Sequence, residues 1–379
     1  MFSKISSLVT LGATFSEAKK TENPTDEIEA GLKLAGGIFD LILDGADKLN
    51  DAKNTTKEND EKAKELATEE KGILNKTYQQ AEAQIKNIET NITNIQELLA
   101  TLDENNEKVK SNNEKLEEQK LIIEENKATI TDANATAEEK QAALAAISAA
   151  GKEINTLGEE VAALAASCQK IQENTEELTV ANDELYANGT EILEEGTDEL
   201  QAVVQRGTTE VTQTLPQTVK DGGEDVIKGT QMITEGTAMV TAGTVAPPVA
   251  LQGSKLIKDG TQYTTAGTTI ITKTGLTIGK YSLTLTDAAS GLSEFLNFTN
   301  TLGSQYSNMA GLLGEAGVVL EPLITSTGSW ANTTSVSERI IAASDRINEQ
   351  LEGQVEGDDV EIDTEDLSTE DLEIEEISA

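Results

Sequence analysis

The sequence predicts an all-α fold: an elongated bundle of long antiparallel coiled-coil helices with a glycine-seamed helical hairpin. Three observations lead to this prediction. Apolar residues recur at three-four spacing over most of the chain, glycines are mirrored about Pro247 and Pro248, and only 3% of the 379 residues are aromatic. A chain so poor in aromatic residues favours long helices over a thick globular core.

The mirrored glycines lie between Val219 and Ile278. Along each arm, β-branched residues and glycines alternate every three or four residues, like the a and d positions of a coiled coil. Each glycine costs a helix about 0.5 to 1 kcal/mol relative to alanine, and facing glycines compensate by letting two backbones approach closely. We expect Gly236 to face Gly260, with the hairpin turn at Pro247 and Pro248. The glycines predicted to form this helix–helix packing are Gly222, Gly229, Gly236, Gly243, Gly253, Gly260 and Gly267.

A β-hairpin is the alternative for this region, because it is rich in threonine and a β-hairpin would also mirror residues about its turn. However, a spacing of seven is odd, so successive glycines of a strand would alternate between its faces. The spacing therefore favours the helical hairpin.

A second heptad pattern precedes the glycines and predicts an antiparallel coiled-coil hairpin. Its d positions from Leu74 to Ile130 are apolar without interruption, and Thr136 with Glu139 forms a capping box after the turn. The short connection favours antiparallel neighbours. Polar residues at a positions fix the register of a coiled coil, and here they are Asn106, Asn113 and Asn182.

The expected domain organisation follows from these patterns. Residues 50–64 are polar and are interpreted as a linker or a solvated helix start, Pro322 is expected to end the long helix, and Trp330 is expected in a loop as a packing anchor. The predicted segments are a flexible N-terminus (1–26), a short apolar helix (27–50), the antiparallel coiled-coil hairpin (60–215, turn near 131–136), the glycine-seamed hairpin continuing as a long helix (217–321, turn at 247–248), a short amphipathic helix (334–352) and an acidic disordered tail (353–379).

Charge and composition exclude several functions. The net charge of −39 argues against nucleic acid as a partner and against attraction to an anionic membrane surface. Without histidine there is no imidazole base, and the single cysteine, Cys168, cannot form an intrachain disulfide. We therefore predict no catalytic, cofactor or metal site, and thus no enzyme. No unbroken apolar run reaches the length of a transmembrane helix, so no stable transmembrane segment is expected.

Three functional hypotheses remain. The leading one is a non-enzymatic helical coiled-coil scaffold or protein-interaction protein that binds a protein partner or copies of itself. The second is a secreted protein whose glycine hairpin rearranges at a membrane. In layout, the long helices with a small-residue hairpin resemble α-helical pore-forming toxins and the translocators of bacterial needle-type secretion systems, and the start from Met1 to Ser16 is similar to export signals of the latter. The third is a filament or surface-appendage subunit. No clear cleavable signal peptide is present, so a cytoplasmic location and export both stay open.

Overall fold

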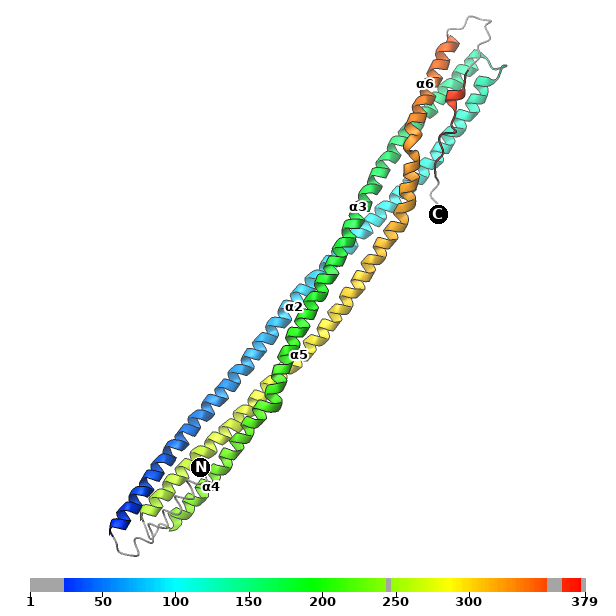
Figure 1. Cartoon of the computed structure of the whole chain (residues 1–379). Helices are drawn as coiled ribbons and strands as arrows, with labels where there is room; N and C mark the ends of the chain where they lie inside the picture. Colours follow the sequence, from blue (N-terminus) through cyan, green and yellow to red (C-terminus); the bar gives the residue numbers. More distant parts are fainter. Residues whose placement is uncertain (1–23, 243–246, 353–362, 376–379) are drawn as a thin grey trace. The chain divides into compact units, whose positions relative to one another are not determined.

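The structure is a computed structural model that describes residues 24–242, 247–352 and 363–375 (Figure 1). Within these ranges it contains helices and no strand, so the predicted all-α fold is confirmed and the β-hairpin alternative is wrong. The helices are α2 (Pro24–Thr131), α3 (Ala137–Thr209), α4 (Leu215–Ala242), α5 (Pro247–Ser329) and α6 (Thr333–Glu352), with a π-helix (Glu210–Thr214) and two 3-10 helices (Trp330–Asn332 and Glu365–Leu367).

The threonines of α4 and α5 bond to their own helices. Their hydroxyls donate to carbonyls four residues earlier, for example from Thr237 to Ile233 and from Thr268 to Thr264, both at 2.7 Å. Each such bond satisfies the hydroxyl without taking it to another strand or helix. A threonine-rich sequence is therefore compatible with these helices.

The chain forms two compact units. The first contains α2 up to Gln79, α3 from Ile192, the π-helix, α4, and α5 up to Asn297, and its helices run side by side in Figure 1. Its core combines aliphatic residues such as Leu200 with small residues such as Ala52 and with aromatic ones. The ring of Tyr78 meets that of Phe295 edge-on, with 5.4 Å between the ring centroids.

The second unit contains α2 from Gln80, α3 up to Glu191, α5 from Phe298, α6 and residues 363–375. Its core is aliphatic, and the apolar d positions of α2 that it contains are fully buried, from Ile88 to Ile130. Trp330 is 4% exposed and its Nε1 donates to Oδ1 of Asn113 at 3.0 Å. The tryptophan packs in the core as expected, but it lies in a 3-10 helix and not in a loop.

Within the second unit, α2 and α3 are antiparallel. The backbone N–H of Thr136 donates to the carboxylate of Glu139 at 2.7 Å, and the N–H of Glu139 donates to the Thr136 hydroxyl at 3.2 Å. The predicted capping box is therefore confirmed. Farther along, Asn105 donates to Ser167. These two residues are equally distant from position 136, as expected for two helices that fold back on each other at this turn.

The expected separation of residues 27–50 from a later coiled coil is wrong, because α2 is continuous from Pro24 to Thr131. Small and polar residues occupy the buried face of the polar stretch, at three-four spacing: Ala52, Thr56, Asn59 and Ala63 are all under 9% exposed. Because those residues are small or polar, apolar periodicity is too weak there to reveal the helix.

Pro322, which was expected to end the long helix, does not do so, and Pro216 also lies in a helix. Pro216 is the second residue of α4 and directly follows the π-helix, whose wider turn accommodates a residue that lacks an N–H and carries a ring. Pro322 lies inside α5, between Leu320 and the fully buried Leu323. Burial of two such leucines contributes about 3 to 6 kcal/mol, which offsets a proline penalty of about 3 kcal/mol.

The acidic tail is ordered in part, contrary to the prediction of a disordered segment. Leu367 and Leu372 are buried against the aliphatic core of the second unit. Asp366 forms an ion pair with Arg346 at 2.7 Å, and Asp371 forms one with Arg339 at 2.8 Å. Two leucines and the arginines of α6 were thus enough to fix this part of the tail; residues 353–362 and 376–379 lie outside the described ranges.

Candidate functional site

The glycines of α4 and α5 bring the two backbones into direct contact. A Cβ on Gly229 would lie 2.5 Å from the carbonyl oxygen of Gly260, and a Cβ on Gly236 would lie 2.6 Å from that of Gly253. The carbonyl oxygen of Gly222 is equally close to Gly267. Real Cβ atoms do not approach oxygen so closely, so only glycine fits at these positions. We call this set of six residues the glycine seam.

The register of the seam differs from the predicted one by one heptad. Gly236 faces Gly253 and not Gly260, and Gly229 faces Gly260. The centre of symmetry therefore lies before the prolines, and Pro247 is the first residue of α5. Proline is well suited to the first turn of a helix, where its N–H would have no partner. Gly243 and the connection 243–246 lie outside the described residues.

The three asparagines predicted to fix the coiled-coil register have different surroundings in the second unit. Asn113 accepts the bond from Trp330, and Asn182 donates to the carbonyl of Tyr306 at 3.4 Å. Oδ1 of Asn106 is buried without a hydrogen-bond partner among the described atoms. The neighbouring Asn105 and Asn112, not singled out from the sequence, are more buried and bond across to α3. A pattern assigned for one helix pair misses them, because α2 has more than one neighbour.

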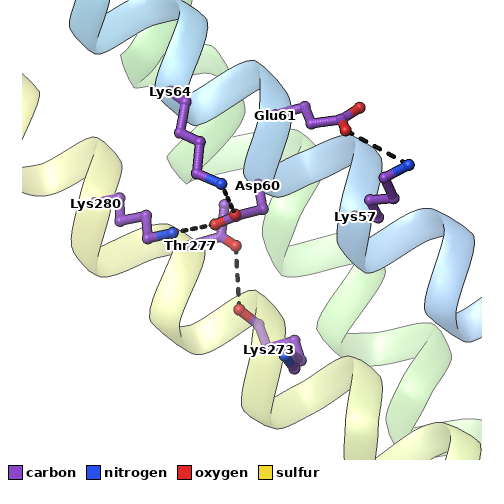
Figure 2. A network of polar contacts seen from close by, with 7 residues as sticks. All are labelled: Lys57, Asp60, Glu61, Lys64, Lys273, Thr277 and Lys280. Atoms are coloured by element: carbon purple, nitrogen blue, oxygen red, sulfur yellow. Dashed lines mark hydrogen bonds and ion pairs between the residues drawn. The ribbon is translucent and has the colours of Figure 1, made fainter.

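A groove between α2 and α5 of the first unit is lined by lysines. Its volume is about 860 Å³. Figure 2 shows Lys64 and Lys280 converging on Asp60 from the two helices, with Lys57 directed to Glu61. We call it the lysine groove, and the residues used below are Lys53, Lys57, Asp60, Lys273, Leu276, Lys280 and Leu283.

Within the groove, hydrogen bonds from Lys280 and Lys64 lower the pKa of Asp60 to about 2. This aspartate therefore stays ionised at any physiological pH and neutralises part of the lysine charge. The groove was not predicted from the sequence. The signal was present in the seven-residue spacing of Lys273 and Lys280 and in the four-residue spacing of Lys53 and Lys57, which places each pair on one helical face.

A second ionisable group of the first unit is Glu70, which is 1% exposed. Neither of its carboxylate oxygens has a hydrogen-bond partner within the described part of the chain. Burial raises the pKa of Glu70, and the charge of Asp287 raises it further. Proton uptake by this group is therefore favoured by folding.

An apolar segment of α5 corrects the expectation that no stretch could cross a membrane. The helical run Val249–Glu352 contains an 18-residue window of mean hydropathy 1.2, which corresponds to residues 309–326 and is 28% buried. The earlier expectation required an unbroken apolar run, whereas this window contains Glu315 and Glu321. Its exposed positions include Gly311, Gly314 and Val318, which is 75% exposed, together with the two glutamates.

The described residues contain no group of three or more Asp, Glu or Cys side chains placed to hold a metal ion. Cys168 is buried in the aliphatic core of the second unit, and burial raises the pKa of its thiol. A buried thiol with a raised pKa is little ionised and hence a poor nucleophile.

No protein-family model and no curated protein matches the sequence. Solved structures similar to this chain include the SmhB pore of the tripartite α-pore-forming toxin Smh from Serratia marcescens, with 12% identity, coverage of 76% of this chain and 96% of that one, and a TM-score of 0.45. The AhlB pre-pore of the tripartite toxin AHL from Aeromonas hydrophila matches with 13% identity, 77% and 85% coverage and a TM-score of 0.40. The AhlB pore matches with 12% identity, 76% and 92% coverage and a TM-score of 0.40.

Proposed function

We propose that the chain is a non-enzymatic, membrane-active protein whose α4–α5 hairpin leaves the first unit and enters a lipid bilayer. The observation that carries the proposal is the tip of this hairpin. No charged residue occurs between Glu235 and Lys255, and Leu251 in this stretch is 60% exposed. When an uncharged helical tip moves from water into lipid, no charged group has to be dehydrated, and the exposed leucine gains apolar contacts.

The polar groups of the tip are compatible with an apolar environment. A bilayer core admits only backbone whose hydrogen bonds are made internally, as they are in a helix. The described hydroxyls of the tip are bonded in the same way: Thr237 donates to Ile233, Thr241 to Thr237 and Ser254 to Ala250, at 2.7 to 3.0 Å. The tip therefore carries few polar groups that need water.

Separation of the hairpin from its neighbours exposes apolar side chains of both helices. The large buried ones in the described part of the hairpin are Leu215 and Met232 of α4 and Leu256, Tyr263 and Ile270 of α5. The seam glycines of α4 contact α5, which moves with α4, so the seam survives the movement. Exposing five large side chains to water costs about 8 to 15 kcal/mol, which contact with lipid must return.

Pore formation is a specific form of this activity. The similar solved structures are described as components of pore-forming toxins. The composition and the hydrogen bonding of the hairpin support membrane activity by themselves.

The proposal is tested by placing a charge on the tip. Leu251→Glu is expected to abolish dye release from phosphatidylcholine vesicles and co-sedimentation with them, because a carboxylate must be dehydrated to enter the bilayer. Leu121→Glu is the matched control, because Leu121 of α2 is also 60% exposed but lies in the second unit. Equal release by the two variants and the unmodified chain, or no release by any of them, would contradict the proposal.

A self-associating scaffold is the second candidate, and the outer face of residues 309–326 favours it. Gly311, Gly314 and Gly317 have open space beside them. Each exposed glycine weakens its helix, and close packing of a second helix against this face would offset that loss of stability. Sedimentation velocity without lipid tests this candidate: Val318→Glu should lower the association of the chain if this face joins copies, and should leave it unchanged otherwise.

A further inference from the structure

The lysine groove is an exception to the charge of the chain. The net charge is −39, yet four lysines line the groove against one aspartate. The first unit as a whole has 18 Lys and Arg against 27 Asp and Glu, and the second has 11 against 41. From Lys228 to Thr286 the sequence contains five lysines and only two acidic residues. The part of the hairpin from Lys228 to Thr286, together with the groove, therefore forms a locally positive region.

Much of this positive charge is not neutralised by the protein. Asp60 is shared between Lys280 and Lys64, and the contact of Lys57 with Glu61 is a long and solvent-exposed 3.7 Å. Within the described residues, Lys53 and Lys273 form no ion pair. The groove can thus accept an anion without breaking a buried interaction.

Apolar side chains border the same cations. Leu276 is 64% exposed and Leu283 is 68% exposed, and they are one heptad apart on α5, as are Lys273 and Lys280. Exposed leucines contribute nothing to the binding of a small inorganic anion. An amphiphile with an anionic headgroup matches both kinds of side chain, because lysine binds phosphate as a compact charge while leucine contacts acyl chains.

We propose that the lysine groove binds the phosphate headgroup of anionic phospholipids and so directs the hairpin to anionic bilayers, an inference that rests on the membrane activity proposed above. Electrostatic screening makes this compatible with the acidic chain. At physiological salt the Debye length is about 8 Å, so distant carboxylates are screened while the groove lysines act at contact. The general expectation of repulsion from anionic surfaces therefore does not hold for this region.

The test compares co-sedimentation of the full chain with phosphatidylcholine vesicles and with vesicles containing phosphatidylglycerol. The unmodified chain is expected to bind the phosphatidylglycerol vesicles more tightly, and less tightly as salt is raised. The double variant Lys53→Gln with Lys273→Gln should lose roughly 10- to 30-fold in affinity for them and keep its affinity for phosphatidylcholine. Both lysines are exposed, so the fold, checked by circular dichroism, should be retained.

The matched control is Lys115→Gln with Lys170→Gln, two exposed lysines of the second unit, which changes the net charge by the same amount. Equal losses in the two double variants would overturn the inference, and so would equal binding of both vesicle types by the unmodified chain. In either case membrane activity would stand. Absence of binding to every vesicle would refute the proposed function, and the inference with it.

Two other occupants give distinct results. If titration with inorganic phosphate reveals saturable binding that the Lys53 and Lys273 substitutions abolish, the groove takes a soluble anion and the lipid assignment is overturned. If these substitutions instead abolish self-association in the absence of vesicles, the occupant is an acidic helix of a second copy, and the assignment is likewise overturned.

Discussion

The α2–α3 coiled coil of the second unit and the α4–α5 hairpin of the first use the same three-four spacing in opposite ways. In α2, the repeated position holds residues such as Leu102 and Ile123, each fully buried. In α4 and α5 it holds glycine, and backbone meets backbone. The first helix pair is stabilised by apolar side chains that must stay out of water, whereas the second is held by close contact within the pair itself.

This difference implies that one heptad period can specify a fixed core or a separable element. Removing α2 from its neighbours would expose a row of leucines and isoleucines at about 1.5 to 3 kcal/mol each. Removing the α4–α5 hairpin as a unit keeps its glycines paired, and it exposes separate large side chains such as Met232, Leu256 and Tyr263. The element proposed to move is thus the one whose glycine packing is internal.

The largest expected effect is in the aliphatic seam. Leu102→Ala should lower the free energy of unfolding of the second unit by about 2 to 5 kcal/mol, because it leaves a cavity at a fully buried position. Urea unfolding followed by circular dichroism measures this. A loss well under 1 kcal/mol would show that the aliphatic seam is not tightly packed and would remove the contrast between the two regions.

Two glycine-to-alanine substitutions in α5 should have smaller effects on stability, one destabilising and the other stabilising. Gly260→Ala places a methyl group 2.6 Å from the carbonyl oxygen of Gly229 and should cost about 1 to 3 kcal/mol. Gly275→Ala, on the same helix with nothing within 4 Å, should stabilise by up to about 1 kcal/mol through helix propensity. Thermal unfolding of both variants separates the two cases. Stabilisation by both would mean that the backbones of α4 and α5 are not in contact.

The smallest expected effect is a pH dependence in the first unit. Because the pKa of Glu70 is raised on folding, its contribution to stability is greatest below its ordinary value of 4.5 and declines as pH rises through the folded value. Asp60 behaves oppositely: its pKa is lowered from 3.8 to about 2, so its contribution to stability is present above pH 3.8 and is lost as the pH falls through about 2.

Glu70→Gln isolates the glutamate. The variant should have a higher melting temperature than the unmodified chain at neutral pH, and the difference should shrink as the pH is lowered toward 4.5. A difference that is constant with pH, or that grows on acidification, would show that Glu70 does not titrate with a raised pKa.

Much of the fold followed from the sequence because heptad spacing is a local signal. The antiparallel turn before Thr136 and the aliphatic seam of α2 were predicted from residue spacing alone, and the capping box that starts α3 was confirmed. The predicted register of the hairpin was wrong by one heptad. Because the glycines recur every seven residues, a shift of seven residues preserves the pattern. The contacts of Gly236 with Gly253 and of Gly229 with Gly260 distinguish the two registers.

The candidate sites were less predictable for a different reason. The lysine groove combines residues of α2 with residues of α5 more than 200 positions later, and no spacing within one helix relates them. The burial of Leu367 in the acidic tail likewise depends on a distant core. Composition indicated a disordered segment there because two leucines contribute little to an average over 27 residues.

The central claim, that the α4–α5 hairpin must separate from α2 to enter a bilayer, is tested most directly by a disulfide. A side chain on Gly45 would place its Cβ 3.5 Å from that of Asp259, within disulfide range, so Gly45→Cys with Asp259→Cys in a Cys168→Ala chain ties α2 to α5 in the first unit. Gly158→Cys with Thr333→Cys, at 3.8 Å, ties α3 to α6 in the second unit as the control. The account predicts that oxidation abolishes dye release by the first variant, that reduction restores it, and that the control releases dye in both states. Equal release by the oxidised and reduced forms of the first variant would contradict it.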